Sequence, residues 1–210
     1  IIRDLAKKGH IVDCIGYPAC LASLSKYLNK CSYKQSFFKE YYIDRFLKFL
    51  EKEKYDYLIP IGANSVNLIN KYRNQISKRV LINLAPFESI RKCLKKDDLL
   101  SLAQTLEIPV PKSFTKNQLK EIIEKGSSLN KKIVIKPASE LSNSKVVYTS
   151  NNHYIEKFIN DKENFLYQEF IEGFGIGFFA IYNHGKIKEF FMHKRIRENP
   201  PSGGSSVCAE

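Results

Sequence analysis

Hydrophobic residues in the first 86 positions form short apolar runs that alternate with segments of helical spacing. The runs at 10–17, 55–61 and 80–84 are typical of buried strands, because Ile, Val, Leu and Tyr dominate them. Residues 46–53, and a second stretch that Ser65 is expected to cap, repeat apolar positions every three or four residues, as one helix face does. This alternation predicts a parallel sheet covered by helices.

The chain begins with a predicted helix rather than a strand. Residues 1–8 favour a helix that Gly9 ends, and an apolar run follows at once, as in the second half of a β-α-β unit. At the other end, Glu210 follows a Gly-Gly-Ser-Ser stretch in which we expect no helix or strand. These two features indicate a fragment that lacks both ends of a longer protein.

The later residues predict a different succession of helices, strands and a hairpin. Two helical pieces over 87–107 stop before Ile108-Pro109-Val110-Pro111, because proline disfavours the α conformation in the residue before it. The elements predicted after these prolines are a helix at 118–125, strands at 132–137, 146–149 and 165–171, a helix at 153–160, and a hairpin of 178–182 with 187–193.

The composition is that of an ordinary globular protein. Apolar residues make up 43% and charged residues 27% of the 210 positions, which is too apolar for a disordered chain. No apolar run approaches the roughly 18 to 20 residues that span a bilayer, so we expect no membrane segment. Five cysteines without a C-x-x-C pair argue against a disulfide scaffold and a cysteine zinc site, and they fit a reducing cytoplasm.

The formal charge of +12 raises the question of a nucleic-acid partner. The lysines are spread along the whole chain and interleaved with acids, as at 51–54, whereas a footprint for a phosphate backbone clusters on one stripe. The charge therefore argues against a dedicated nucleic-acid interface, and it favours small anionic ligands through the overall field.

Four stretches after residue 93 resemble the motifs of one enzyme superfamily, in the same order. They are Leu94-Lys95-Lys96 with 103–111, Ile-Val-Ile-Lys-Pro at 133–137, Gln-Glu-Phe-Ile-Glu-Gly at 168–173, and His-Lys-Arg-Ile-Arg-Glu-Asn-Pro with Gly-Gly-Ser at 193–205. The sequence is thereby similar to the ATP-grasp superfamily, close to its carbamoyl-phosphate-synthase-like ligases.

The resemblance implies an α/β fold in several parts. A partial Rossmann-like pre-ATP-grasp domain with a parallel sheet is expected at 1–88, without its first strand, and connecting helices at 89–112. The α+β ATP-grasp lid subdomain is expected at 113–172, and the beginning of the large antiparallel-sheet subdomain at 173–210.

Two lysines are implied to hold the phosphates of ATP. Lys136 lies on a predicted strand whose Ile133 and Ile135 point inward, so its ammonium group is expected to face the nucleotide cleft. The resemblance places Lys96 at a second phosphate position, although Lys95 stands where the family has an acidic residue. Lysine suits this role because it is a compact point charge.

The strand at 168–171 resembles the hinge that binds the adenine edge in this superfamily. By this resemblance, the carbonyl of Glu169 and the amide of Ile171 contact the adenine. The Gln168 side chain is expected nearby, and Phe170 is expected to alternate away from the nucleotide. A plain core strand with a glycine turn is the alternative interpretation.

Two features near the hinge depart from the family pattern. Gly175 stands where many relatives carry a carboxylate for the ribose, so either Glu172 takes that role or the ribose is held less tightly. The loop at 139–145 contains no glycine, whereas relatives close a glycine-rich loop over the phosphates. Its backbone amides and Lys145 could still hold phosphate.

Two arginines are implied to hold a substrate carboxylate or an acyl-phosphate oxygen. Arg195 and Arg197 alternate with Ile196, so both are expected on one face of the strand, which His193 shares. Relatives bind Mg²⁺ through acidic residues that include a Glu-x-Asn motif. No such motif follows these arginines, so no metal ligand is assigned within the sequence and the ligands are expected beyond Glu210.

The resemblance implies the ATP-binding part of a Mg²⁺-dependent ligase that joins a carboxylate to an amine or thiol through an acyl phosphate. Its partners are then small-molecule carboxylates and amines, with a homodimer left open, and we expect the 210-residue chain alone to be inactive. The alternative from the missing loop glycines is a non-catalytic nucleotide-binding module. A basic nucleic-acid-binding protein is the third hypothesis, and it rests on charge alone.

Overall fold

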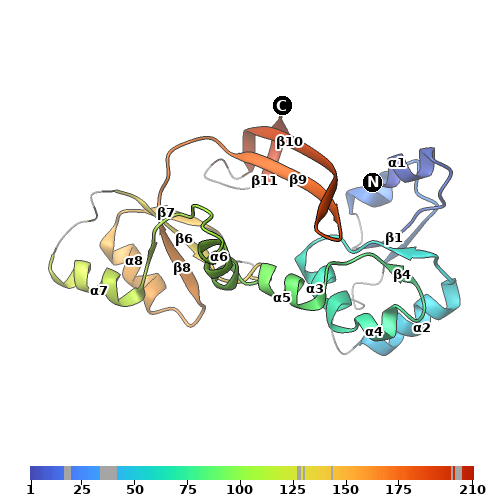
Figure 1. The fold of residues 1–210 in the computed structure, drawn as a ribbon, viewed down its shortest axis with the longest axis horizontal. Helices are drawn as coiled ribbons and strands as arrows, with labels where there is room; N and C mark the ends of the chain where they lie inside the picture. Colours follow the sequence, from blue (N-terminus) through green and yellow to red (C-terminus); the bar gives the residue numbers. More distant parts are fainter. Residues whose placement is uncertain are drawn as a thin grey trace. The chain divides into compact units, whose positions relative to one another are not determined.

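The structure is a computed structural model that describes residues 1–16, 20–33, 42–126, 129, 131–142, 144–199, 201 and 205–210 (Figure 1). Contacts along the chain divide it into two units, Ile1–Arg91 and Lys92–Glu210. The finer domain boundaries given above stay predictions. Within the part of the chain that the structure describes, no helix has the length and apolar character needed to cross a membrane.

The first unit alternates helices with strands. Its elements are α1 (Ile2–Lys7), β1 (Asp13–Gly16), the 3₁₀ helix η1 (Leu21–Leu24), β2 (Lys30–Tyr33), α2 (Ile43–Glu53), β3 (Tyr57–Leu58), α3 (Ala63–Lys71), α4 (Arg73–Ile76), β4 (Leu81–Ile82) and α5 (Phe87–Cys93), which runs past Arg91. β1 pairs with β2 and β3 pairs with β4, both in parallel. The predicted parallel strands are confirmed, in two separate pairs.

One hydrophobic core serves both parallel pairs. Ile15 of β1, Leu58 of β3 and Ile82 of β4 pack against the same buried cluster. That cluster consists of Phe46, Leu47, Phe49, Leu50, Ile69, Ile76 and Val80. Four of these seven lie on α2 at helical spacing, which explains why the apolar pattern there predicts the helix correctly.

The strands of the first unit are shorter than predicted. β3 covers two residues of the run at 55–61, and β1 covers four residues of the run at 10–17, where Tyr17 lies outside the described residues. β2 has no apolar alternation in its Lys-Cys-Ser-Tyr sequence and was not predicted. It is a strand because it pairs with β1, and pairing partners are not visible in a local pattern.

The prediction that Ser65 caps α3 is wrong. Gly62 is the N-cap of α3, with a φ of +84° that glycine adopts without steric cost. Ser65 lies in the first turn and is buried, and its hydroxyl donates to the carbonyls of Ile61 and Gly62 at 2.5 and 2.9 Å. The serine therefore bonds back toward the end of the preceding strand segment.

The second unit contains two antiparallel sheets. Its further elements are α6 (Lys96–Thr105), β5 (Ser113–Phe114), α7 (Lys116–Glu124), β6 (Ile133–Pro137), β7 (Val147–Thr149), α8 (Asn152–Ile159), β8 (Phe165–Glu169), β9 (Ile176–Asn183), β10 (Lys186–Asn199) and β11 (Ser205–Ala209). The strand order is β5-β8-β6-β7 in one sheet and β11-β10-β9 in the other.

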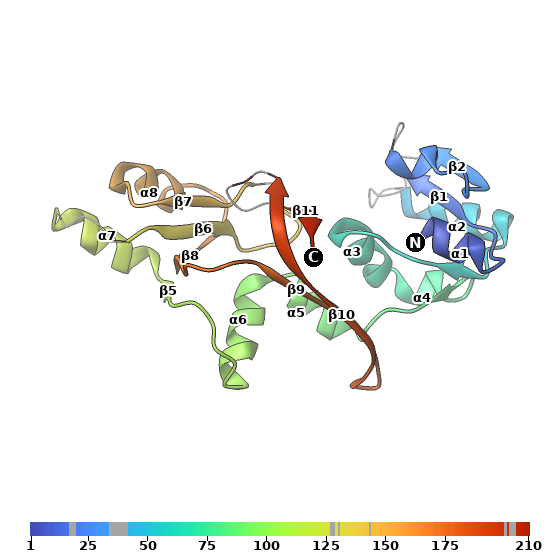
Figure 2. The same ribbon diagram turned by 90° about the horizontal axis from the view of Figure 1, so that it is seen from above.

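Helices α7 and α8 cover one face of the four-stranded sheet (Figure 2). Leu119 of α7 and Ile155 of α8 are fully buried against Ile133 and Ile135 of β6. Thr115 fixes the start of α7 through a capping box with Gln118. Because successive side chains of a strand alternate between faces, Lys136 points to the face opposite the helices.

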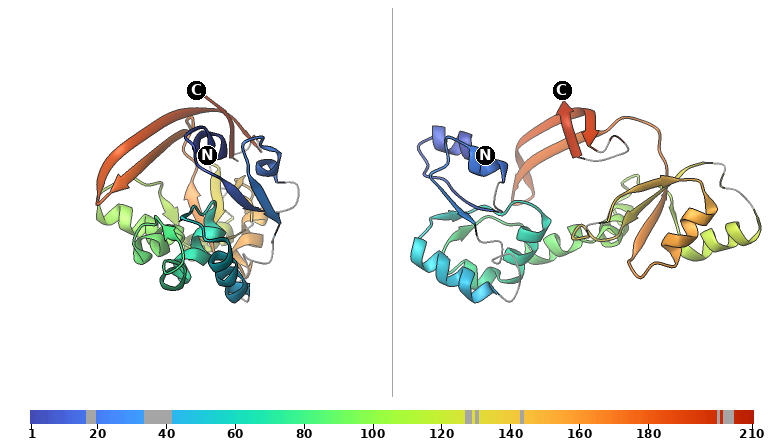
Figure 3. Two further views of the ribbon diagram at one scale, coloured as in Figure 1. Left: turned by 90° about the vertical axis from the view of Figure 1, so that its right-hand side faces the viewer. Right: turned by 180° about the vertical axis from the view of Figure 1, so that it is seen from behind.

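The three-stranded sheet consists of the predicted hairpin and a strand that was not predicted. β9 and β10 pair over most of their length, and β11 pairs with the end of β10 (Figure 3). The expectation of no strand near Glu210 is therefore wrong for β11. Large apolar side chains of this sheet are exposed among the described residues, including Phe178, Phe179, Ile181, Phe190 and Phe191.

Leu119→Ala is expected to lower the free energy of unfolding of the second unit by about 2–5 kcal/mol, because Leu119 is 0% exposed and its removal leaves a cavity. Leu106→Ala is the matched control, since Leu106 at the end of α6 is 61% exposed and its loss should cost within about 0.5 kcal/mol. Urea unfolding of both variants measures the difference, and equal losses would contradict the described core.

Candidate functional site

Lys136 projects from the open face of the four-stranded sheet. Its backbone lies between Ile135 and Pro137, whose side chains are buried on the helix-covered face, and it pairs with Leu166 of β8. The Lys136 side chain itself is half-buried. The predicted orientation away from the core is thus what the strand alternation produces.

Lys96, at the start of α6, lies beside the end of β6, the strand that carries Lys136. Its backbone N–H donates to the carbonyl of Ala138 at 2.7 Å, and Lys95 forms a β-bridge with Ser139 just after β6. These contacts attach the first turn of α6 to the end of the strand that carries Lys136. The Lys96 ammonium Nζ lies 3.0 Å from Oε1 of Glu140.

The two lysines and Glu140 form one electrostatic cluster. Burial lowers the pKa of Lys136 below its ordinary value, and the nearby positive charge of Lys96 lowers it further, while Glu140 acts in the opposite direction. The half-exposed Glu140 carboxylate thus pairs with Lys96 and also acts electrostatically on Lys136. The cluster has an excess of positive charge and is suited to an anion with several oxygens, such as a di- or triphosphate.

The hinge region is held by contacts at the end of β8. The N–H of Phe170 donates to the carbonyl of Lys132, so the carbonyl of Glu169 points to the other side, toward Lys112. The Lys112 N–H donates to Oε1 of the Glu169 side chain at 2.8 Å. The described hydrogen bonds at this edge therefore leave the Glu169 carbonyl available, and the next hinge residue, Ile171, is 61% exposed.

Two hinge side chains make contacts that the sequence did not predict. Gln168 is 2% exposed and its amide donates to Oγ of Ser113 at 3.2 Å, so the side chain joins β8 to β5. Phe170 was expected to alternate away from the nucleotide. Instead, its ring contacts Tyr148 edge to face at 5.8 Å, and Tyr148 shares the open face because it pairs with Val134.

The loop at 139–145 is tied to an acidic residue that the sequence did not single out. The hydroxyls of Ser142 and Ser144 both donate to the carboxylate of Glu163, while Lys145 is exposed. Asn143 lies outside the described residues. Two serine hydroxyls and one carboxylate thus anchor this loop, whereas a glycine-rich loop would have more conformational freedom.

His193 and Arg195 lie beside Gly177 of the neighbouring strand β9 and Gly175 just before it. A Cβ atom on Gly177 would come within 2.4 Å of the His193 ring, and one on Gly175 within 2.8 Å of the Arg195 Cδ. A carboxylate-bearing residue at 175 would therefore collide with Arg195. The glycine at this position follows from that close approach, while Glu172, the candidate substitute, is exposed.

These two basic side chains line a hollow of about 470 Å³ between β9, β10 and β11. Nε2 of His193 and Nε of Arg195 are buried without a hydrogen-bond partner among the described residues, whereas Nη1 of Arg195 lies 3.2 Å from Glu198. The register shifts on both sides of Arg197, so regular alternation fails there, and Arg197 is not among the residues of the hollow. The expectation of a face shared by both arginines is wrong.

Sequence reasoning missed the two acidic residues of this region. Glu140 and Glu163 lie in loops after β6 and α8, outside every motif, and they contact functional candidates only through the fold. A weak signal existed for Glu140, because it follows Lys136 by four residues in a stretch with an unusual lack of glycine. Nothing in the local sequence marks Glu163.

The sequence by itself matches no protein-family model, and no curated protein matches it significantly. Solved structures do match. The chain is similar to an L-amino acid ligase from Bacillus licheniformis, with a TM-score of 0.62 and 16% identity, over 92% of this chain and 46% of that one.

Two further structures carry nucleotides. Carboxyaminoimidazole ribonucleotide synthase from Aspergillus clavatus, complexed with ATP, matches with a TM-score of 0.63 and 9% identity, over 94% of this chain and 51% of that one. The biotin carboxylase domain of 2-oxoglutarate carboxylase from Hydrogenobacter thermophilus, a dimer in complex with MgADP, ADP and bicarbonate, also matches. Its TM-score is 0.64 and its sequence identity is 10%, over 94% of this chain and 47% of that one.

Sequence identities of 9 to 16% are low, so these similarities support a shared fold alone. The chain spans about half the length of the structures it matches. The described part of the chain therefore shares the ATP-grasp fold of these structures over about half of their length, and the fold class predicted from the motifs is confirmed.

Proposed function

We propose that this chain is the ATP-binding part of an ATP-dependent ligase, which activates a carboxylate as an acyl phosphate and joins it to an amine or thiol. The observation that carries the proposal is the meeting of Lys96 and Lys136 around the single carboxylate of Glu140. The ATP-grasp fold and the nucleotide-bound structures that share it support the same activity.

The lysine pair, Lys96 with Lys136, would bind phosphate oxygens in place of Glu140. ATP supplies the phosphoryl group that is transferred. Because phosphoryl transfer needs positioning and charge stabilisation more than covalent chemistry, two fixed ammonium groups on a partly buried surface suit it. Lys145, the last residue of the loop at 139–145, is exposed and would add positive charge near the phosphates.

The adenine edge would be read by the hinge backbone. The Glu169 carbonyl is an acceptor without a partner from the neighbouring strand segment, and Ile171 continues the same edge. Gln168 stabilises the sheet beneath this edge, and the ring of Phe170 would offer an apolar surface on the open face. Glu172 remains the candidate for the ribose hydroxyls.

Arg195, with His193, is the candidate for the carboxylate substrate. Both side chains have a buried nitrogen without a partner in the described hollow, which fits an oxyanion ligand. Arg197, at the register shift, is left out of this role. The substrate class that fits is a small carboxylate, such as an amino acid or bicarbonate, which the names of the matched proteins also mention.

Mg²⁺ bound together with the nucleotide would neutralise phosphate charge. The carbamoyl-phosphate-synthase-like subgroup, the cytoplasmic location and the inactivity of this chain alone also stay predictions. Formation of a homodimer is proposed only by analogy with the biotin carboxylase dimer.

A non-catalytic nucleotide-binding module is the second candidate function. The observation that favours it is the tie between the loop at 139–145 and Glu163, because a catalytic loop must close and open over phosphates. The two candidates differ in turnover. A full-length protein that binds ADP but releases none from ATP with any carboxylate and amine would be a module.

Lys136→Ala is expected to weaken ADP binding by about 10- to 100-fold, the range for losing one charge-assisted hydrogen bond. Lys131→Ala is the control, because Lys131 is exposed just before the same strand and should leave affinity unchanged. Isothermal titration with Mg·ADP measures both. Unchanged affinity in Lys136→Ala would refute the assignment of this lysine.

ADP affinity is expected to fall as the pH rises through the pKa of free Lys136, which burial and Lys96 lower. Bound phosphate favours the ammonium form, so the pKa is higher in the complex, and above the free pKa binding must take up a proton. The decline is up to about tenfold per pH unit. Lys136→Arg should bind without this decline, because arginine stays protonated; the same decline in that variant would contradict the cause given.

Glu140→Gln is expected to strengthen ADP binding by about two- to fivefold at neutral pH, because it removes the carboxylate that competes with phosphate for the lysine pair. The exposed Glu121, paired with Lys125 on α7, provides the control Glu121→Gln, which should have no effect. Weaker binding in Glu140→Gln would show that the carboxylate supports the site instead.

A further inference from the structure

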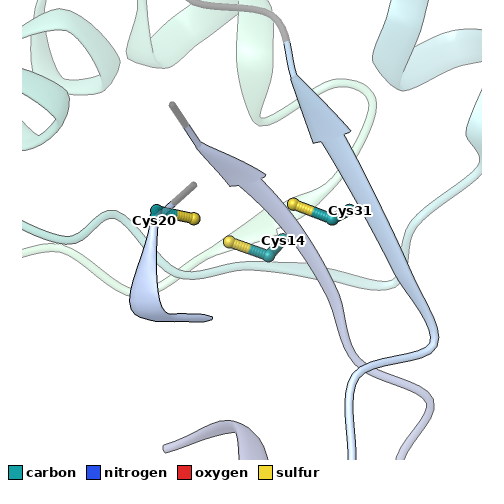
Figure 4. A group of neighbouring side chains, drawn as sticks. All are labelled: Cys14, Cys20 and Cys31. Carbon is teal, nitrogen blue, oxygen red and sulfur yellow. The ribbon is translucent and has the colours of Figure 1, made fainter. Parts of the chain in front are cut away.

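Three cysteines of the first unit converge on one point. Cys14 lies on β1, Cys31 lies on β2, and Cys20 directly precedes η1. Their Sγ atoms all lie within 4.8 Å of one another (Figure 4). The sulfurs of Cys14 and Cys20 point toward each other, and that of Cys31 enters the same space from the neighbouring strand.

The parallel register brings two of these thiols together. Cys14 and Cys31 are direct partners in the β1–β2 pair, so their side chains emerge on the same face of adjacent strands. The Asn29 N–H donates to the carbonyl of Val12 at 2.9 Å and the Asn29 side chain donates to Asp13 at 2.8 Å, which fixes this register. The two thiols are therefore held side by side by backbone pairing.

The third thiol is held by the loop and by a glycine. The carbonyl of Cys20 accepts the N–H and the hydroxyl of Ser23, at 2.9 and 2.7 Å. A Cβ atom on Gly16 would come within 2.9 Å of the Cys20 sulfur, so a side chain there would push the thiol away from the cluster. Glycine at position 16 therefore leaves room for the Cys20 sulfur beside the other two sulfurs.

The chemistry of three partly buried thiols suits a soft metal ion. Thiolates select thiophilic ions such as Zn²⁺ and Cu⁺ over Mg²⁺ or Ca²⁺. Three sulfurs bound tetrahedrally at about 2.3 Å from zinc are roughly 3.8 Å apart, so the present spacing requires inward movement of about 1 Å at most. All three cysteines are partly accessible, which gives an ion a path to the site.

We propose that Cys14, Cys20 and Cys31 bind one thiophilic d¹⁰ metal ion, Zn²⁺ or Cu⁺, through their three sulfur atoms. Binding converts three thiols into three metal-bound thiolates and releases three protons to solvent, with no change of oxidation state. For zinc, a water molecule completes the fourth position, because the described cluster holds three candidate ligands. This site is independent of the nucleotide function proposed above.

The consequence of this site is a cross-link within the first unit. One ion would join β1, β2 and the segment that leads into η1, all of which are short elements. Because the ion binds the folded state, it should stabilise the unit by RT ln(1 + c/Kd), where c is the free ion concentration and Kd its dissociation constant. The melting temperature should therefore rise on addition of zinc.

The test begins with the chain purified under reducing, metal-free conditions. One equivalent of Zn²⁺ is expected to bind and to protect three thiols from alkylation, which peptide mass spectrometry should map to Cys14, Cys20 and Cys31. Cys93 and Cys208, which are outside the cluster, should react as before. Co²⁺ should replace zinc and give sulfur-to-metal charge-transfer and d–d absorption bands, while competition with a chromophoric Cu⁺ chelator distinguishes copper from zinc.

Cys14→Ser and Cys31→Ser are expected to lose the cobalt bands and the zinc-dependent rise in melting temperature. Cys93→Ser and Cys208→Ser should retain both. The proposal is overturned if the reduced chain binds neither ion, if the ion that binds protects no thiol of the cluster, or if the control variants lose the metal equally. Alkylation mapping uses the unmutated chain, so it decides the question even if a serine variant fails to fold.

Discussion

The candidate site depends on holding two like charges close together on one face of a sheet. Lys136 and Lys96 repel each other, and burial of Lys136 adds to the cost of its charge. The fold opposes this repulsion by bonding the first turn of α6 to the end of β6 and by pairing the Lys96 ammonium with Glu140, whose charge also favours the ammonium form of Lys136. An arrangement that costs free energy in the absence of a ligand is typical of a binding site for an anion.

The rest of the second unit positions this charge pair. α7 and α8 bury the other face of the sheet, so the open face is left with Lys136, Val134 and the ring of Tyr148. β8 pairs with β6, and the hinge backbone continues from the end of β8. The phosphate and adenine candidates are thus fixed by strand pairing, which makes their spacing a property of the sheet rather than of flexible loops.

The sequence predicted those parts of the site that depend on regular local rules. Alternation around Ile135 correctly placed Lys136 outside the core. The same rule failed at Arg197, because the register shifts there and alternation assumes uninterrupted pairing. Tertiary neighbours were not predictable: Glu163 reaches the serine loop only through the fold, and Cys31 meets Cys14 only through the register of two parallel strands.

A crystal structure of the chain with ADP would test the central claim most directly. Our account predicts that the ammonium groups of Lys96 and Lys136 both lie within hydrogen-bonding distance of phosphate oxygens, with the Glu140 carboxylate displaced from Lys96. The adenine would then lie against the Glu169 carbonyl. Nucleotide bound elsewhere, with the contact between Lys96 and Glu140 unchanged, would contradict the account.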